Sequence, residues 1–412
     1  MKELLIKGGS QMSTSLLYHT SRINGVKYKA TRYEKGTVIW VVELQHGICR
    51  CSQCGDYHHN FKERKTRRIR TVPIGTKPCF IEIQTHRLEC RKCKHRWWPK
   101  FSFIAGLRRM TRVFAQYLIS MMKLGTIKAV AEFTGVSWDT VKDIHKEHLQ
   151  KKYRSVEYAS LRYLGIDEFS IKKGHEYMTV VVDLETGRIV YAVEGRSKES
   201  IMPFLRKLAR RAKNLIAMAM DMSGPYESAV REILPDVDIV FDHYHVMALC
   251  SKAIDEIRRE QQNRCNVVGL RTLKGQRFLL LKNFEKLGTT EKSSLEALLE
   301  INKPLAIAHT MKEQLRLFWI KRDSQEGARC LGWWIIEAME SQISELAKVG
   351  KTLLDHFEGL LTYFKHRVTN AKTEGINNKI KTLKRQAYGY RDMEYFKLRL
   401  YHLHKQETSL VG

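Results

Sequence analysis

The 412-residue sequence contains no apolar run that approaches the roughly 18 residues needed to span a bilayer. Its first ten residues, MKELLIKGGS, lack the apolar core of a secretory signal. It also has no internal repeat and no low-complexity tract. We therefore expect a folded cytoplasmic protein with no membrane partner. A chain of this length with 43% hydrophobic residues can form two or three domains with ordinary packed cores.

Acidic residues are scarce relative to basic ones: the sequence has 44 Asp and Glu against 72 Lys and Arg, a formal net charge of +28. The excess is concentrated in residues 1–155, which contain 31 basic and 11 acidic residues. Basic and aromatic residues are interleaved there in KERKTRRIR, CRKCKHRWWPK and LRRMTRVF, a pattern typical of surfaces that neutralise phosphates. No long basic helix carries a lipid-facing aromatic stripe, so nucleic acid is a better partner than a membrane surface.

The cysteines favour a metal site over a disulfide framework, because the nine are an odd number and six of them lie between Cys49 and Cys93. Two C-x-x-C pairs flank a basic, strand-like segment. Four thiolates at this spacing predict a zinc ribbon, in which Zn²⁺ compensates for the small core of a basic module. The predicted ligands are Cys51, Cys54, Cys90 and Cys93. The gap between the pairs, 35 residues, is long, so four alternatives stay open: Cys49, Cys79, His58 and His59.

Residues 111–150 have helical periodicity in three successive segments. The middle segment ends at Gly135, Ser137 can cap the next one through its hydroxyl, and Asp139 is favourable in the first turn. This spacing predicts a helix-turn-helix, with a plain packing unit of three helices as the alternative. In a helix-turn-helix, the start of the last helix reaches the base edges. The residues there are Ser137, Trp138, Asp139, Thr140 and Lys142.

From about residue 160, short apolar strands and helices predict an α/β layered domain. Asp167 follows YLGI and Asp221 follows LIAMAM, at expected strand ends, where such sheets place ligands. Residues 246–365 lose the strand signal and predict an all-α block. The helix that follows has one acid, Glu374, among amide and cationic residues. On its face lie Asn378, Lys381 and Arg385, and nearly opposite lie Ile376, Ile380, Leu383 and Ala387.

Two strand-end aspartates and a helical glutamate are oxygen ligands of the kind that hold two divalent cations. On DNA, such a site supports hydrolysis when water attacks and strand transfer when a 3′-hydroxyl attacks. Because the sequence contains 44 acids, many such triplets could be chosen. A DNA-binding regulator with a non-catalytic C-terminal domain is therefore the main alternative, and a nuclease that does not join strands is another.

From about Met12 onward, the chain resembles the DDE transposases of bacterial insertion sequences in the ISL-three family. The resemblance is carried by CSQCG with LECRKC, GVSWDTVKDI, GIDEFSIKKGHEYMTVVVDL, AMDMSGPY, IVFDHYHV and TEGINNKIKTLKRQAYGYRD. It implies a multidomain α+β protein. The implied domains are an N-terminal lead-in at 1–45, a zinc ribbon at 46–103, a helix-turn-helix DNA-binding domain at 104–155, and an RNase H-like α/β catalytic domain at 156–412 with an all-α insertion at about 246–365. Residues 1–11 would precede the usual family start.

The resemblance also implies roles for individual residues. Asp167, Asp221 and Glu374 would be the three acids that bind Mg²⁺ or Mn²⁺. Asp242 and His245 in DHYH resemble an acid-x-x-His motif of several transposase families, in which His245 would contact the scissile phosphate or only stabilise the fold. Lys381 and Arg385, with Asn378, would position the DNA backbone.

The implied function is binding of terminal inverted repeats followed by metal-dependent strand cleavage and strand transfer. The implied partners are double-stranded transposon-end and target DNA and further copies of the chain, as a homodimer or larger synaptic complex. Such a protein would be associated with the nucleoid.

Overall fold

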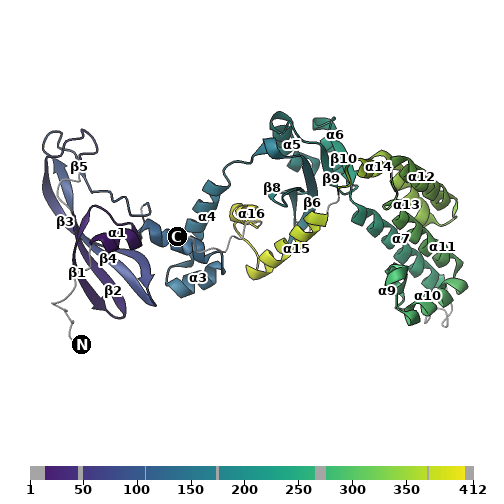
Figure 1. Cartoon of the computed structure of the whole chain (residues 1–412), viewed down its shortest axis with the longest axis horizontal. Helices are drawn as coiled ribbons and strands as arrows, with labels where there is room; N and C mark the ends of the chain where they lie inside the picture. The colour runs from purple at the N-terminus through teal and green to yellow at the C-terminus, as the bar shows by residue number, and fades with distance from the viewer. Residues whose placement is uncertain are drawn as a thin grey trace. The chain divides into compact units, whose positions relative to one another are not determined.

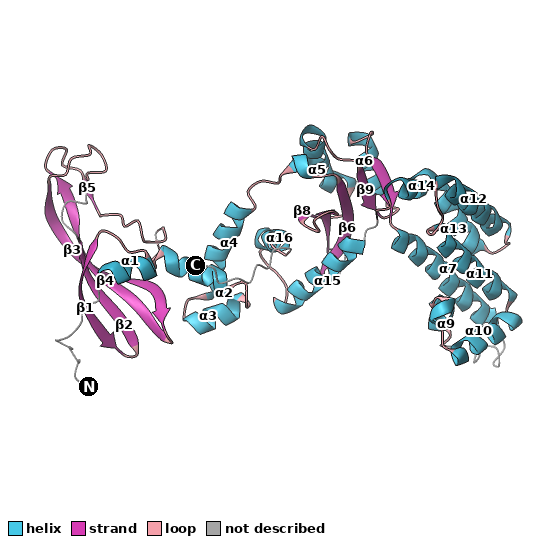
Figure 2. Ribbon diagram, viewed as in Figure 1, coloured by secondary structure: helices cyan, strands magenta, loops and turns pink. Residues whose placement is uncertain are grey.

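The computed structural model describes residues 14–44, 50–106, 108–172, 176–264, 275–368 and 371–403. The described residues divide into two compact units, the first ending at Lys152 and the second beginning at Tyr153. Figures 1 and 2 show the helices and strands of both units. In the part of the chain that the structure describes, no helix is both long and apolar enough to cross a membrane.

The first unit contains a sheet in the order β1-β2-β4-β3, with β5 paired to β4. It consists of β1 (Val26–Glu34), β2 (Thr37–Leu44), β3 (His59–Ile74), β4 (Lys77–Cys90) and β5 (Arg96–Trp97), preceded by α1 (Thr14–Ser21). The strand expected at TVIWVVEL is β2, and it pairs in parallel with β4. Strands on both sides of residue 46 therefore join one sheet, so the expected lead-in and ribbon share a core. That core includes Trp40, Ile69 and Ile81.

Three helices follow the sheet, as the periodicity of residues 111–150 predicts: α2 (Arg112–Met121), α3 (Ile127–Thr134) and α4 (Trp138–Lys152). The hydroxyl of Thr111 caps α2, and the hydroxyl of Thr126 caps α3. Gly135 ends α3 with φ 67°, a left-handed conformation that glycine adopts without steric cost. The helices bury Phe114, Leu118, Val130, Val141 and Ile144 against one another.

The second unit is built on a mixed sheet in the order β10-β9-β6-β7-β8. Its strands are β6 (Tyr163–Lys172), β7 (Glu176–Asp183), β8 (Ile189–Glu194), β9 (Ala217–Met220) and β10 (Asp238–Phe241). The first three form an antiparallel meander, and β9 and β10 extend the sheet parallel to β6. A short helix, η1 (Tyr158–Ser160), leads into β6.

Helices cover both faces of this sheet, because residues in each strand alternate between the faces. In β7, Val181 packs toward α5 (Lys198–Arg211) and α6 (Gly224–Ile233). Its neighbours Val180 and Val182 pack toward α15 (Ala371–Gln386) and α16 (Met393–Tyr401). The predicted α/β layers are therefore present.

The described residues between β10 and α15 form helices and their connections, as the all-α prediction for 246–365 requires. The elements are α7 (His243–Arg264), α9 (Arg277–Leu281), η2 (Phe284–Lys286), α10 (Thr289–Ile301), α11 (Lys303–Phe318), α12 (Ser324–Glu340), α13 (Ser344–Asp355) and α14 (Phe357–His366). Their apolar residues share one core with the α5 and α6 face of the sheet. Gly359 of α14 allows close packing on β10, because a Cβ there would lie 2.3 Å from Cε2 of the buried Phe241.

Candidate functional site

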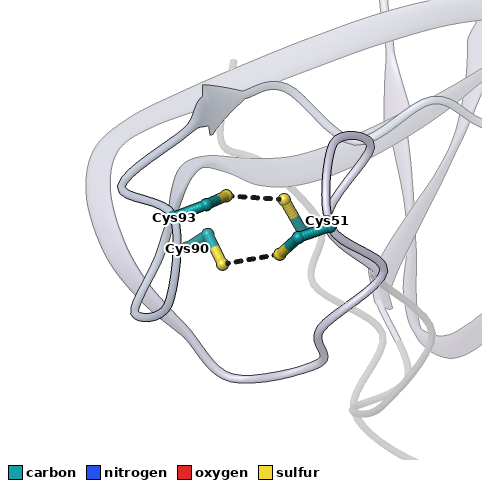
Figure 3. A group of neighbouring side chains, drawn as sticks. Cys51, Cys90 and Cys93 are labelled. Carbon is teal, nitrogen blue, oxygen red and sulfur yellow. Dashed lines mark hydrogen bonds between the residues drawn. The ribbon is translucent and has the colours of Figure 1, made fainter.

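The four predicted cysteines of the two knuckles lie together in the first unit (Figure 3). The Sγ atoms of Cys51 and Cys93 are 3.6 Å apart, and those of Cys54 and Cys90 are 3.5 Å apart. These distances are too long for disulfides, whose sulfurs are about 2.05 Å apart. They are close to the edge of about 3.8 Å that follows from a tetrahedral site with Zn–S distances of about 2.3 Å. The cluster therefore fits a tetrahedral thiophilic cation.

The thiols of the cluster differ in acidity: at Cys54 the lowering by the Asp56 backbone N–H is outweighed by burial and the three neighbouring cysteines, which raise the pKa to about 12, whereas the pKa of Cys51 is lowered. Burial alone would raise the pKa of Cys51, but the backbone N–H groups of Cys54 and Gln53 outweigh it and lower the pKa to about 7. Of the alternative ligands, Cys79 is a fully buried core residue, and burial raises its pKa to about 12. The ring of His58 is bound to Asp56 instead. Cys49 lies outside the described residues, and His59 packs edge-on against Trp97.

The second unit gathers acidic residues where its parallel strands end. Asp221 follows β9 and Asp242 follows β10, as expected for strand-end residues. Asp167 departs from the expectation, because it lies inside β6 opposite Val180 of β7. The reason is that β6 continues as a hairpin with β7 after its pairing with β9 has ended at Gly165. Asp167 therefore still lies just beyond the parallel part of the sheet.

The ligand atoms of Asp167, Asp221 and His245 all lie within 4.8 Å of one another. His245 occupies the first turn of α7, and its Nε2 is 2.9 Å from Oδ1 of Asp221 and 3.8 Å from Oδ2 of Asp242. The 2.9 Å contact makes His245 and Asp221 an ion pair when the imidazole is protonated. The sheet thus juxtaposes two carboxylates and an imidazole from three separate elements.

Burial and mutual repulsion shift the ionisation of this group. Burial raises the pKa of Asp167 to about 6, assisted by the negative charges of Asp221 and Asp242 and opposed by the Glu168 backbone N–H. Burial lowers the pKa of His245, but the nearby aspartates outweigh burial and raise it overall. Closely spaced carboxylates of this kind are stabilised when a cation lies between them.

The helix α15 contributes an amide to this group. Asn377 donates from Nδ2 to Oδ2 of Asp167 at 2.6 Å, and its own Oδ1 is buried without a hydrogen-bond partner in the described structure. Glu374, three residues earlier, is exposed and is not a member of the cluster. The sequence reasoning did not assign Asn377 to the acids. Its spacing from Glu374, which places both on one helix face, was the signal that could have identified it.

Packing of α15 largely follows its sequence pattern. Ile376, Ile380 and Leu383 are buried against the sheet, whereas Asn378, Lys381 and Arg385 are exposed, as predicted. Ala387 departs from the expected apolar face, because α15 ends at Gln386 and Ala387 is exposed beyond it. The exposed cations of α15 are therefore free to meet an anionic partner.

The start of α4 has the geometry that the spacing predicts. Ser137 accepts a hydrogen bond from the backbone N–H of Thr140 at 3.4 Å, and its hydroxyl bonds the Thr140 hydroxyl at 2.8 Å. Trp138 is 46% exposed, with the Nζ of Lys142 5.6 Å from its ring centroid. Asp139 is also exposed. The five predicted residues therefore form an accessible helix start.

Comparisons with known proteins agree with this arrangement. A family model described as "Transposase", of the DDE type in the ISL3 group, matches residues 164–400. A second, "Helix-turn-helix domain of transposase family ISL3", matches residues 99–149. A curated relative, "Transposase for insertion sequence element IS1001" of Bordetella parapertussis, is 32% identical over 354 residues, covering 85% of this chain and 87% of that protein.

Two further proteins are similar at lower levels. The "Transposase for insertion sequence element IS1557" of Mycobacterium tuberculosis is 27% identical over 372 residues, covering 83% of this chain and 82% of its own. A solved structure, "Drosophila P element transposase strand transfer complex", has a TM-score of 0.39 and 11% identity, covering 71% of this chain and 92% of that one. A TM-score of 0.39 is too low to assign a shared fold.

A helix-turn-helix and an acidic cluster on a mixed sheet, together with these matches, define the class as a DNA transposase. The family model covers more than half of the chain, and the first curated relative is similar over most of its length. The chain belongs to the ISL3 family of transposases. Membership in a DDE transposase family implies that the enzyme uses divalent metal ions.

Proposed function

We propose that this transposase binds the terminal inverted repeats of its insertion sequence, cleaves DNA at the acidic cluster of the second unit and joins the cut ends to target DNA. The observation that carries the proposal is the convergence of Asp167, Asp221 and His245, whose ligand atoms lie within 4.8 Å of one another. Transposase sequences that match almost the whole second unit support it further.

We also propose that residues 156–412 form an RNase H-like catalytic domain with an all-α insertion. A meander of three strands, extended on one side by two strands parallel to the first, supports this assignment because it is the strand order of RNase H-like folds. The all-α insertion lies between β10 and α15, which supports the assignment of α15 as a catalytic helix that packs on the sheet although it follows the insertion in sequence.

In this proposal Asp167, Asp221 and Glu374 hold Mg²⁺ or Mn²⁺. The donor set fits, because carboxylate oxygens are preferred by these hard cations and the buried Oδ1 of Asn377 has no hydrogen-bond partner in the described structure. When bound, a pair of such ions activates the attacking oxygen and stabilises the leaving oxygen of the phosphodiester. Glu374 is supported by its place one turn before Asn377, which touches Asp167.

The protein's own groups orient this chemistry. The Glu168 backbone N–H donates to Oδ1 of Asp167 at 2.7 Å, and Asn377 donates to Oδ2, so both carboxylate oxygens are held in place. His245, whose raised pKa favours the imidazolium, would keep its proton and donate a charge-assisted hydrogen bond to a phosphate oxygen of the scissile strand.

DNA recognition is assigned to the helix-turn-helix and to the exposed face of α15. Residues at the start of α4 would reach base edges, and those of α15 would contact phosphates of the strand being cut. The first group is Ser137, Trp138, Asp139, Thr140 and Lys142, and the second is Asn378, Lys381 and Arg385. We assign Zn²⁺ to the four cysteines, and a homodimer or larger synaptic complex to the active form, since both element ends must be held together.

The decisive experiment compares Asp167→Ala, Asp221→Ala and Glu374→Ala with the unaltered protein on duplexes that carry each end of the element. We expect all three variants to lose cleavage in Mg²⁺. Binding to the ends should be retained, because the helix-turn-helix of the first unit is unchanged. Full cleavage by any one variant would remove that acid from the proposed triad.

A further inference from the structure

The strands β3 and β4 extend beyond the sheet of the first unit. Pairing between β2 and β4 stops at Val42 and Ile83, whereas β3 and β4 remain paired from Thr66 and Gln84 to His59 and Cys90. Residues 59–66 and 84–90, called the arm below, therefore form a ribbon of β3 and β4, with the two-residue β5 paired to β4 at Leu88 and Glu89 and the four-cysteine cluster at its end. β3 is an edge strand, so one side of the arm has no neighbouring strand in the described sheet (Figure 2).

The β3 strand of the arm is exposed and basic. Residues 61–66 are six consecutive exposed residues, and because side chains alternate along a strand, they are accessible on both faces, whereas Thr85, Leu88 and Glu89 of β4 are buried. Lys62 is paired with Glu89 at 3.2 Å, but Arg64 and Lys65, on opposite faces, have no ion pair within the described residues. Residues 50–100 contain 14 Lys and Arg against four Asp and Glu, so the field around the arm is strongly positive.

The shape and chemistry of the arm fit duplex DNA. Outside the short pairing with β5, the arm consists of two strands about 4.8 Å apart, a ribbon of the kind that the major groove, about 12 Å wide, admits. Eight residues in β3 from His59 to Thr66 extend over roughly 25 Å at about 3.3 Å per residue, a large part of one helical turn. A protein partner is a poorer fit, because Phe61 is the only large apolar side chain among residues 61–66.

The same strand is attached to the helix-turn-helix. Arg70 of β3 donates from Nη2 to the carbonyl oxygen of Thr134 at 3.1 Å, at the end of α3. Its guanidinium also lies over the rings of Phe80 and Phe114, at 4.9 and 5.3 Å from their centroids. The backbone of Arg70 bonds both ends of the segment that leads into α2, from Arg109 to Thr111. These contacts hold the arm in a fixed register with the helix-turn-helix.

We propose that the arm is a second DNA-contacting element, in which Arg64 and Lys65 neutralise phosphates of the transposon-end duplex at a fixed distance from the bases read by α4. This rests on the proposed function in that the duplex is an element end. The two elements together contact one continuous bipartite site, and the four-cysteine cluster stiffens the free end of the arm.

The test uses the full-length protein, zinc-loaded, with the double variant Arg64→Ala, Lys65→Ala. The matched control removes Arg206 and Lys207, two exposed residues of α5 on the other unit. Binding is measured by fluorescence anisotropy over a salt series, on a duplex cut from each end of the element and on an unrelated duplex. Zinc content and the circular dichroism of both variants report folding.

Loss of two phosphate contacts is expected to make the slope of log K against log salt shallower by about 1.8, which corresponds to about 30-fold weaker binding at 0.15 M salt. The α5 control should retain the slope. An unchanged slope in the arm variant, or an equal loss in the control, would overturn the proposal. If the unaltered protein bound the element-end duplexes and the unrelated duplex equally well, recognition of the ends would be contradicted. The change of salt slope on the unrelated duplex would still test whether Arg64 and Lys65 contact phosphates.

The fixed register is tested on the DNA. Hydroxyl-radical footprints should show two protected segments, one lost in the arm variant and the other weakened by Lys142→Ala. Inserting about five base pairs between them rotates one segment by half a helical turn. We expect affinity to fall to that of the arm variant. Unchanged affinity with both segments still protected would refute a rigid connection.

Discussion

The hydrogen bond between Asn377 and Asp167 gives the sharpest test of the catalytic cluster. In Asn377→Ala, the Oδ2 atom of Asp167 loses a donor at 2.6 Å, and the carboxylate is free to rotate. A hydrogen bond to a charged group contributes about 1.5–3 kcal/mol, or roughly 10- to 150-fold in an equilibrium constant. Loss of a residue that orients a metal ligand typically costs about 10- to 100-fold in metal affinity or activity.

We therefore expect the Mg²⁺ concentration that gives half-maximal cleavage to rise by about 10- to 100-fold in Asn377→Ala, with little change in DNA affinity. The assay is single-turnover cleavage of a labelled element end across a Mg²⁺ titration, with anisotropy measured in parallel. Asn378→Ala is the matched control, because this neighbour is exposed on the same helix and is assigned to DNA contact rather than to the carboxylate.

The two asparagines should thus separate: Asn378→Ala weakens binding and leaves the Mg²⁺ requirement unchanged. Cleavage by Asn377→Ala with the unaltered Mg²⁺ profile would refute the reasoning, because it would mean that the observed hydrogen bond does not orient Asp167. Rescue of Asn377→Ala by high Mg²⁺, with no rescue of Asp167→Ala, would distinguish a positioning residue from a ligand.

Three further outcomes are expected. Gly359→Ala should destabilise the second unit by about 1–3 kcal/mol in urea unfolding, because its Cβ would overlap a buried phenylalanine of β10. Gly332→Ala, which has open space around it, should stabilise the same unit by up to about 1 kcal/mol. Equal effects of the two substitutions would contradict this packing. Cys51→Ser should lose zinc and make the end of the arm sensitive to protease, whereas Cys79→Ala, a core residue outside the cluster, should keep its zinc in metal analysis. Asp167→Asn should raise the free energy of unfolding in EDTA at pH 7 by an amount of the order of 2 kcal/mol, measured by urea unfolding, because a folded-state pKa raised to about 6 makes the ionised carboxyl destabilising. The gain should vanish as the pH falls from 6 toward 4, and a gain that is independent of pH would contradict the assigned cause.

Much of the first unit could be predicted because its signals are local. Each signal lies within a few residues of sequence: a C-x-x-C pair such as that of Cys51, the glycine that ends α3 at Gly135, and the serine that caps α4 at Ser137. The parallel pairing of β2 with β4 was not predictable in this way, because it joins strands separated by a complete hairpin strand and depends on a shared core.

The acidic cluster was only partly predictable for the same reason. Asp221 ends a strand that hydropathy locates, but Asp167 lies within a strand whose length depends on its pairing with β7. Ala387 was expected on the apolar face of the α15 helix, yet it is exposed beyond the end of the helix. Local periodicity gives the faces of a helix but not the exact rotation at which it docks.

The sequence by itself determined the charge segregation, the cysteine knuckles, the helix-turn-helix and the family, because these are carried by composition and short spacing. The tertiary structure alone decided which side chains meet. It brought Asn377 to Asp167 across 210 residues of sequence and left Glu374 exposed one turn away. It also extended β3 and β4 into a ribbon on which residues 61–66 of β3 form an exposed basic strand. Contacts of this kind depend on how sheets end and how helices dock, and those follow from packing of the whole core.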